Sequence, residues 1–149
     1  MKFNANEMNM NKDNWGLDID EYVASLPLAQ QRLHQYCTED LHNDKGRQMA
    51  LAQGMISPDF LNGQCVGSEF NCIGYYTDYV EVFGDVKLRC ILMDDQYQTY
   101  STVSAGVAKI VKSWISAGII PSVDDPIYVQ YLQQRNGMMQ YYTLRIINK

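Results

Sequence analysis

Tyrosine rings recur beside basic side chains in the C-terminal half of the sequence, a combination typical of surfaces that bind single-stranded nucleic acid. The chain has 149 residues and eleven tyrosines, and nine of the tyrosines follow residue 70. A ring can stack on any base, while a neighbouring Lys or Arg contacts phosphate. The predicted nucleic-acid-binding residues are Tyr75, Tyr79, Lys87, Arg89, Tyr128, Tyr141 and Arg145. The alternative, that these rings are ordinary half-buried strand residues, stays open here.

A second set of residues could carry metal chemistry. Glu69, Asp85 and Lys87 provide two carboxylates and a lysine, the groups with which a nuclease holds Mg²⁺ and activates water. Asp85 follows Gly84, however, and this dipeptide is typical of a turn. A Mg²⁺-dependent nuclease is therefore only a minor alternative.

The remaining candidates for chemistry favour structural roles. His34 and His42 have no third metal ligand nearby, and the four cysteines lack C-x-x-C spacing. The acidic pairs at 94–95 and 124–125 are expected in solvated loops. The sequence contains no phosphate-binding loop, nucleophile elbow or H-E-x-x-H motif. We therefore expect a non-enzyme with no catalytic residue, metal or cofactor.

Charge and hydropathy limit the functional class further. The net charge of −5 argues against a simple basic clamp on nucleic acid. Acidic residues exceed basic ones modestly in both 1–56 and 57–149, so the charge balance does not distinguish the functions of the two parts. The N-terminus lacks the apolar core of a signal peptide, and no apolar run reaches the roughly 18 residues of a membrane helix. We expect a cytoplasmic protein with reduced thiols and no membrane partner.

The elements that position these residues fall into two kinds. Residues 1–16 are expected to form a flexible arm and 17–63 a helical extension, including an amphipathic helix over 28–41 and another over 45–53. Turn residues between 57 and 63 mark the boundary.

From residue 64 to 149 the sequence predicts a β-rich domain. The expected elements are strands over 70–83, 86–93 and 97–100, a helix from about 103 to 117, and strands over 127–132 and 138–147. Gly74 suggests a bulge in the long first strand. Three strands, one helix and two strands are the order of the OB-fold. The predicted class is thus α+β, a five-stranded OB-type β-barrel after a mostly helical segment, although another small α+β arrangement stays open.

Three segments carry a resemblance to a known family. Gly84–Arg89, Tyr100–Val107 and Tyr141–Leu144 resemble the small single-stranded DNA-binding proteins of tailed phages with protein-primed replication. The resemblance covers about 64–149. It implies an OB-fold, no enzymatic activity, and coating of displaced single strands during replication.

These observations lead to one leading function and one alternative. We expect a phage-type single-stranded DNA-binding protein with little sequence preference, located in the host cytoplasm if phage-encoded. Its N-terminal helices would bind a replication protein or mediate self-association. The alternative is a phage-type interaction or inhibitor module that binds a host protein.

Overall fold

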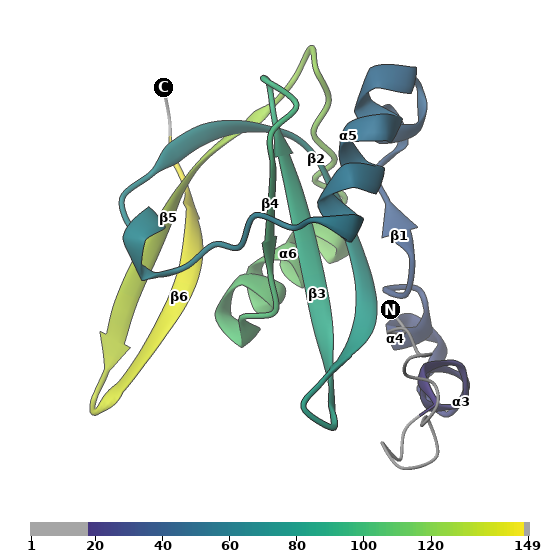
Figure 1. The fold of residues 1–149 in the computed structure, drawn as a ribbon. Helices are drawn as coiled ribbons and strands as arrows, with labels where there is room; N and C mark the ends of the chain where they lie inside the picture. The colour runs from purple at the N-terminus through teal and green to yellow at the C-terminus, as the bar shows by residue number, and fades with distance from the viewer. Residues whose placement is uncertain (1–17, 148–149) are drawn as a thin grey trace. The chain divides into compact units, whose positions relative to one another are not determined.

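The computed structural model describes residues 18–147, so the predicted flexible arm at 1–16 lies outside the described residues. The chain is α+β, with an antiparallel six-stranded sheet and several helices (Figure 1). By internal contacts it divides into two compact units. Of the described residues, 18–36 and 77–89 form the first unit, and 37–76 and 90–147 form the second. Each unit is formed by two separate segments of the sequence. The predicted single boundary at residue 63 therefore does not separate them.

The sheet contains most of the predicted strands. Its strands are β1 (Tyr36–Cys37), β2 (Glu69–Val82), β3 (Asp85–Asp94), β4 (Thr99–Thr102), β5 (Ile127–Asn136) and β6 (Met139–Ile146). The order is β4-β3-β2-β5-β6, and β1 pairs with β2. The sheet is open, because β4 and β6 are the two ends of this order and no described residues join them in a ladder. A closed barrel is therefore not seen.

The helices are α3 (Ile19–Ala24), α4 (Leu28–Gln31), α5 (Lys45–Ile56) and α6 (Ala105–Ala117), with 3-10 turns η2 (Glu39–His42) and η3 (Gly63–Cys65). None of the helices between residues 18 and 147 is long and apolar enough to cross a membrane.

The predicted amphipathic helix over 28–41 is wrong. The α-helix α4 ends at Gln31; the chain then turns through Gln35, whose φ is 62°, and continues into β1 and the 3-10 turn η2. A positive φ is left-handed backbone, which a right-handed helix cannot include. Gly54 also does not end the next helix: α5 continues to Ile56, and Gly54 is buried against Thr99. A Cβ at Gly54 would lie 2.5 Å from Thr99 Oγ1, so close packing explains this glycine.

The first unit contains α3, α4 and the hairpin that joins the end of β2 to the start of β3. Asp18 caps α3 by accepting a hydrogen bond from the Asp20 N–H. The Thr77 hydroxyl donates to the Leu33 carbonyl at 2.6 Å. The hairpin turns through Phe83 and Gly84, which both have positive φ.

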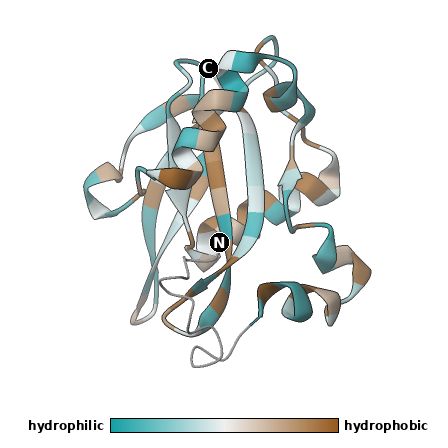
Figure 2. Cartoon of the chain, turned by 45° about the vertical axis from the view of Figure 1, so that its right-hand side comes forward, coloured by the Kyte–Doolittle hydropathy of each residue, from teal (hydrophilic) through white to brown (hydrophobic). Residues whose placement is uncertain are grey.

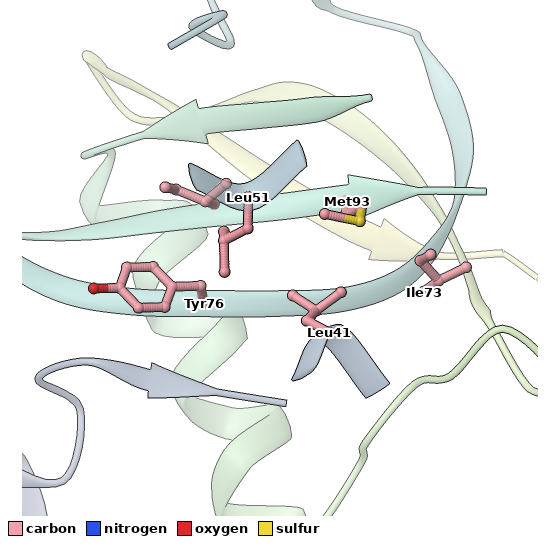
Figure 3. Close-up of a cluster of buried hydrophobic side chains, with 6 residues drawn as sticks. Leu41, Leu51, Ile73, Tyr76 and Met93 are labelled. Atoms are coloured by element: carbon pink, nitrogen blue, oxygen red, sulfur yellow. The ribbon is translucent and has the colours of Figure 1, made fainter. Parts of the chain in front are cut away.

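In the second unit, a hydrophobic cluster lies where β2 and β3 meet α5 and η2 (Figure 3). Leu41 comes from η2, Leu51 from α5, and Ile73, Tyr76, Ile91 and Met93 from the two strands. A central strand of the sheet is hydrophobic along much of its length (Figure 2). Helix α6 buries the stripe Val107, Val111 and Trp114.

Candidate nucleic-acid interface

Two of the predicted stacking tyrosines are buried, which corrects the expectation that they face solvent. Tyr75 is fully buried in the second unit. Its ring packs on Trp114 at 5.8 Å between centroids, and its hydroxyl donates to the Ile119 carbonyl at 2.9 Å. Strand alternation could not decide its face, because residues on both faces of β2 are buried around it.

Tyr79 is buried in the first unit in a similar way. Its ring meets Tyr22 edge-to-face at 5.9 Å, and its hydroxyl donates to the Gln30 carbonyl. Burial raises the pKa of the Tyr79 hydroxyl, and Tyr22 adds to the shift. Neither Tyr75 nor Tyr79 presents a ring on which a base could stack.

The two predicted basic residues of β3 differ from each other. Lys87 is exposed. Arg89 instead forms a bidentate pair with Asp78, at 2.9 Å and 2.6 Å, and both side chains are nearly buried. Since its guanidinium is already bound by a carboxylate, Arg89 is a structural residue of this hairpin.

The remaining predicted residues meet on the β5–β6 hairpin. In the ladder Gln130 lies opposite Arg145, and Gln134 lies opposite Tyr141. Residues opposite each other, and residues two apart, share a face of an antiparallel pair. Tyr128 therefore shares this face with Tyr141 and Arg145. The structure brings three of the seven predicted site residues together.

The outer half of this hairpin, residues 133–141, is exposed on both faces, and we call it the hairpin arm (Figure 1). The Tyr141 side of the arm offers a 39 % exposed ring, whose hydroxyl donates to Gln134 at 3.1 Å. At the base of the arm, Arg145 donates to Gln130 at 2.7 Å, an interaction with a neutral partner. The arm thus presents a ring and a cation that is not bound by a carboxylate.

Tyr128 is the third member of the face and is less available. Its hydroxyl donates to the Glu69 carboxylate, and this hydrogen bond raises the pKa of Tyr128. Glu69 also accepts from Gln130. Glu69 is thereby engaged in the sheet.

The predicted nuclease set gains no support from metal-ligand geometry. The described residues contain no group of three His, Cys, Asp or Glu side chains placed to hold a metal ion.

Charge is distributed unevenly along the chain, although a comparison of residues 1–56 with 57–149 does not show it. Residues 96–149 carry five of the twelve basic residues and only two of the seventeen acidic ones. Strands β5 and β6 contain Arg135 and Arg145 and no acid, and α6 contains Lys109 and Lys112 and no acid. The residues predicted from the sequence to bind nucleic acid did not include Arg135, Lys109 or Lys112. Counting charges in each predicted strand and helix would have added them to the candidates.

Helix α6 holds β6 in place through close backbone packing. A Cβ at Gly106 would overlap the carbonyl oxygen of Tyr142 and lie 3.2 Å from Cδ2 of the Tyr141 ring. The Ser104 hydroxyl also donates to the Tyr142 carbonyl at 3.4 Å. The ring of Tyr141 therefore rests against the start of α6, and Lys109 follows one turn later on that helix.

No family model, curated protein or solved structure matches this chain. Its function is therefore inferred from the hairpin arm and its surroundings.

Proposed function

We propose that this protein binds single-stranded DNA with little sequence preference through the hairpin arm and its base. One observation carries the proposal: within an acidic chain, an exposed two-stranded arm carries the Tyr141 ring on one face and Arg135 on the other, has Arg145 at its base, and contains no carboxylate. Ring stacking tolerates any base, and the guanidinium groups attract phosphate. Because the net charge is −5, the chain as a whole does not attract DNA from a distance, and binding depends on the local contacts of the arm.

The strand order supports an OB-type interpretation of the same fold. An OB-fold is a partly open five-stranded barrel in which three strands, a helix and two strands follow one another. Here β2, β3 and β4 precede α6, and β5 and β6 follow it. The sheet order β4-β3-β2-β5-β6 is that of such a barrel opened between its third and last strands. The resemblance to phage proteins favours a role in DNA replication without enzymatic activity, in the host cytoplasm.

Titration of a fluorescent oligo-dT at low salt tests the proposal. We expect saturable binding, weakened in Tyr141→Ala by a stacking contribution of about 1–3 kcal/mol. Tyr141→Phe keeps the ring and loses only the hydroxyl bond to Gln134, so it should bind nearly as the unmodified chain does.

Salt dependence provides the second measurement. Replacing both Arg135 and Arg145 by Ala should reduce the slope of log K against log salt by about 1.4, roughly 0.7 for each phosphate contact on a single strand. Arg32→Ala, an exposed arginine in the first unit, is the matched control. The proposal fails if oligo-dT does not bind, or if Arg32→Ala weakens binding as much as the double variant.

A further inference from the structure

A hollow of about 600 Å³ lies where the end of α6 meets the start of β5 and the end of β6. Its apolar wall consists of five isoleucines: Ile119, Ile120, Ile127, Ile146 and Ile147. Two of them remain substantially exposed, Ile120 at 54 % and Ile146 at 47 %. Aliphatic side chains clustered around an open hollow are typical of a surface that binds another molecule.

The surroundings of the hollow are acidic. Asp125 lines it, next to the exposed Asp124. Asn71 also lines it and donates a 3.0 Å hydrogen bond to the exposed Asp95. Asp125 thus lines the hollow itself, and Asp95 lies one hydrogen bond beyond its lining. The nearest base along the chain, Arg145, is bound to Gln130.

Helix α6 adds to this negative potential. It ends at Ala117, and its cap Gly118 lines the hollow. The last carbonyls of a helix carry a partial negative charge. The same end of the helix has no basic residue in its last turn to offset that charge.

The loop that carries Asp125 is held in place. Ser122 and Asp125 exchange backbone hydrogen bonds, and the Val123 N–H donates to the Asp40 carboxylate at 2.9 Å. Asp40 is held in turn by Arg47. A preformed rim lowers the entropic cost of binding.

We propose that this hollow docks a segment of a partner protein in which bulky apolar side chains are flanked by Lys or Arg. The isoleucine wall accepts the apolar side chains, and the carboxylates with the helix end attract the flanking cations. Nucleic acid is a poor occupant, because its phosphates would meet Asp95, Asp124 and Asp125. The hollow adjoins the base of the hairpin arm, because Tyr128 also lines it, but its isoleucines and carboxylates differ in chemistry from the ring and cations of the arm.

Synthetic peptides and the full-length chain with labelled isoleucine methyl groups test the site by NMR. The first peptide has a Leu-Ile-Leu core flanked by lysines, the second has the same core flanked by glutamates, and the third has a Ser-Gly-Ser core flanked by lysines. We expect only the first to shift the methyl signals of Ile119, Ile120 and Ile146 at concentrations on the order of 1 mM or below.

Two variants assign the binding to the two features of the hollow. The double variant Asp95→Asn and Asp125→Asn preserves side-chain shape and removes two charges. We expect it to lower the affinity for the first peptide about tenfold at low salt. Ile120→Ser should also lower the affinity for the first peptide, because it removes an exposed apolar side chain from the wall of the hollow. Asp85→Asn, an exposed acid in the first unit, is the matched control and should leave affinity unchanged.

Several outcomes would overturn the proposal. Equal binding of the glutamate-flanked peptide, or unchanged affinity in the double aspartate variant, removes the charge argument. Shifts of the Ile119 and Ile120 methyl signals by oligo-dT alone would assign the hollow to nucleic acid, whereas a shift of Ile146 alone would report binding at the neighbouring Arg145. Shifts that follow dilution of the protein alone would assign it to a second copy of the chain.

Discussion

At the scale of single residues, the Asp78–Arg89 pair shows how a charged side chain can look like a binding residue and be structural. Alternation along β3 places Arg89 opposite the apolar face of Leu88 and Cys90, the usual position of a solvated base. In the structure its guanidinium lies 2.6 Å from the Asp78 carboxylate, and both side chains are nearly buried. The sequence contains both residues but not the pairing of β2 with β3 that brings them together.

This pair yields a stability prediction. Arg89→Ala leaves the buried Asp78 carboxylate without this cation, so we expect the free energy of unfolding to fall by about 3–5 kcal/mol. Urea denaturation followed by circular dichroism measures the change. Lys87→Ala, two residues away and exposed, should stay within about 0.5 kcal/mol of the unmodified chain. A similar small effect for Arg89→Ala would mean that the pair contributes little.

The same pair limits how binding experiments can be interpreted. A chain lacking Arg89 would lose DNA binding by unfolding as readily as by losing a phosphate contact. Arg135 and Arg145 lie on exposed strand positions, where replacement by Ala leaves no buried partner unpaired. They are therefore the better probes of the interface.

At the scale of elements, the sequence predicted the order of strands and the helix well where one pattern dominated. Observed β2 at 69–82, β3 at 85–94 and β5–β6 from 127 to 146 lie close to their predicted ranges, because alternation and the turns at Gly84 and Gly137 mark them. The predicted third strand is shifted: β4 begins at Thr99, and Tyr97 belongs to the turn with a φ of 64°.

The N-terminal elements were predicted less well, for a physical reason. Leu33 and Leu41 lie at a helical spacing, and both are buried. They are buried in different units, Leu33 in the first and Leu41 in the cluster of the second. Apolar spacing therefore predicted one helix where the chain passes from one core to another.

The junction between α6 and β6 provides a prediction for an element contact. Gly106→Ala would drive a methyl group into the Tyr142 carbonyl, a backbone atom that cannot rotate away. We expect the free energy of unfolding to fall by about 1–3 kcal/mol, the usual effect of overpacking. Thermal unfolding measures this loss.

The control for this junction is Ser116→Ala, an exposed position on the same helix, which should unfold close to the unmodified temperature. Because Tyr141 touches Gly106, the Ala variant should also bind oligo-dT less tightly if the arm is the interface. Unchanged stability would show that α6 can move away from β6 without loss.

At the scale of the whole molecule, the burial of ionisable groups predicts how stability depends on pH. Burial raises the pKa of the Cys72 thiol from 9.0 to about 12 and that of the Tyr131 hydroxyl from 10.0 to about 12. Each group keeps its proton in the folded state at a pH where it ionises in the unfolded chain. Their contribution is therefore fully present below about pH 9 and is lost as pH rises toward 12.

Urea denaturation at a series of alkaline pH values checks this expectation. The free energy of unfolding should decline from about pH 9 upward, and Cys72→Ala should make the decline less steep. Ser116→Ala, an exposed position without an ionisable group, is the control and should leave the slope as it is. A slope that does not respond to Cys72→Ala would mean that this thiol is not protected by burial.

The candidate site was predicted in part for reasons that also operate at this scale. The strand faces of Tyr128, Tyr141 and Arg145 could be predicted because hairpin alternation alone determines them. Tyr75 and Tyr79 were not, because β2 is covered on both sides by segments far away in sequence. The hollow at the end of α6 could not be predicted, since it requires knowing that residues 71, 118–120, 125–128 and 146–147 meet.

The open sheet has one further feature, which concerns its free edges. Ser101 of β4 exchanges backbone hydrogen bonds with Asp59 and Leu61, and the start of α6 lies on the Tyr142 carbonyl of β6. An uncovered strand edge is a template to which another chain can add its own strand. Segments 59–61 and the start of α6 therefore occupy part of each edge, and a strand from another chain would have to displace them to pair at Ser101 or Tyr142.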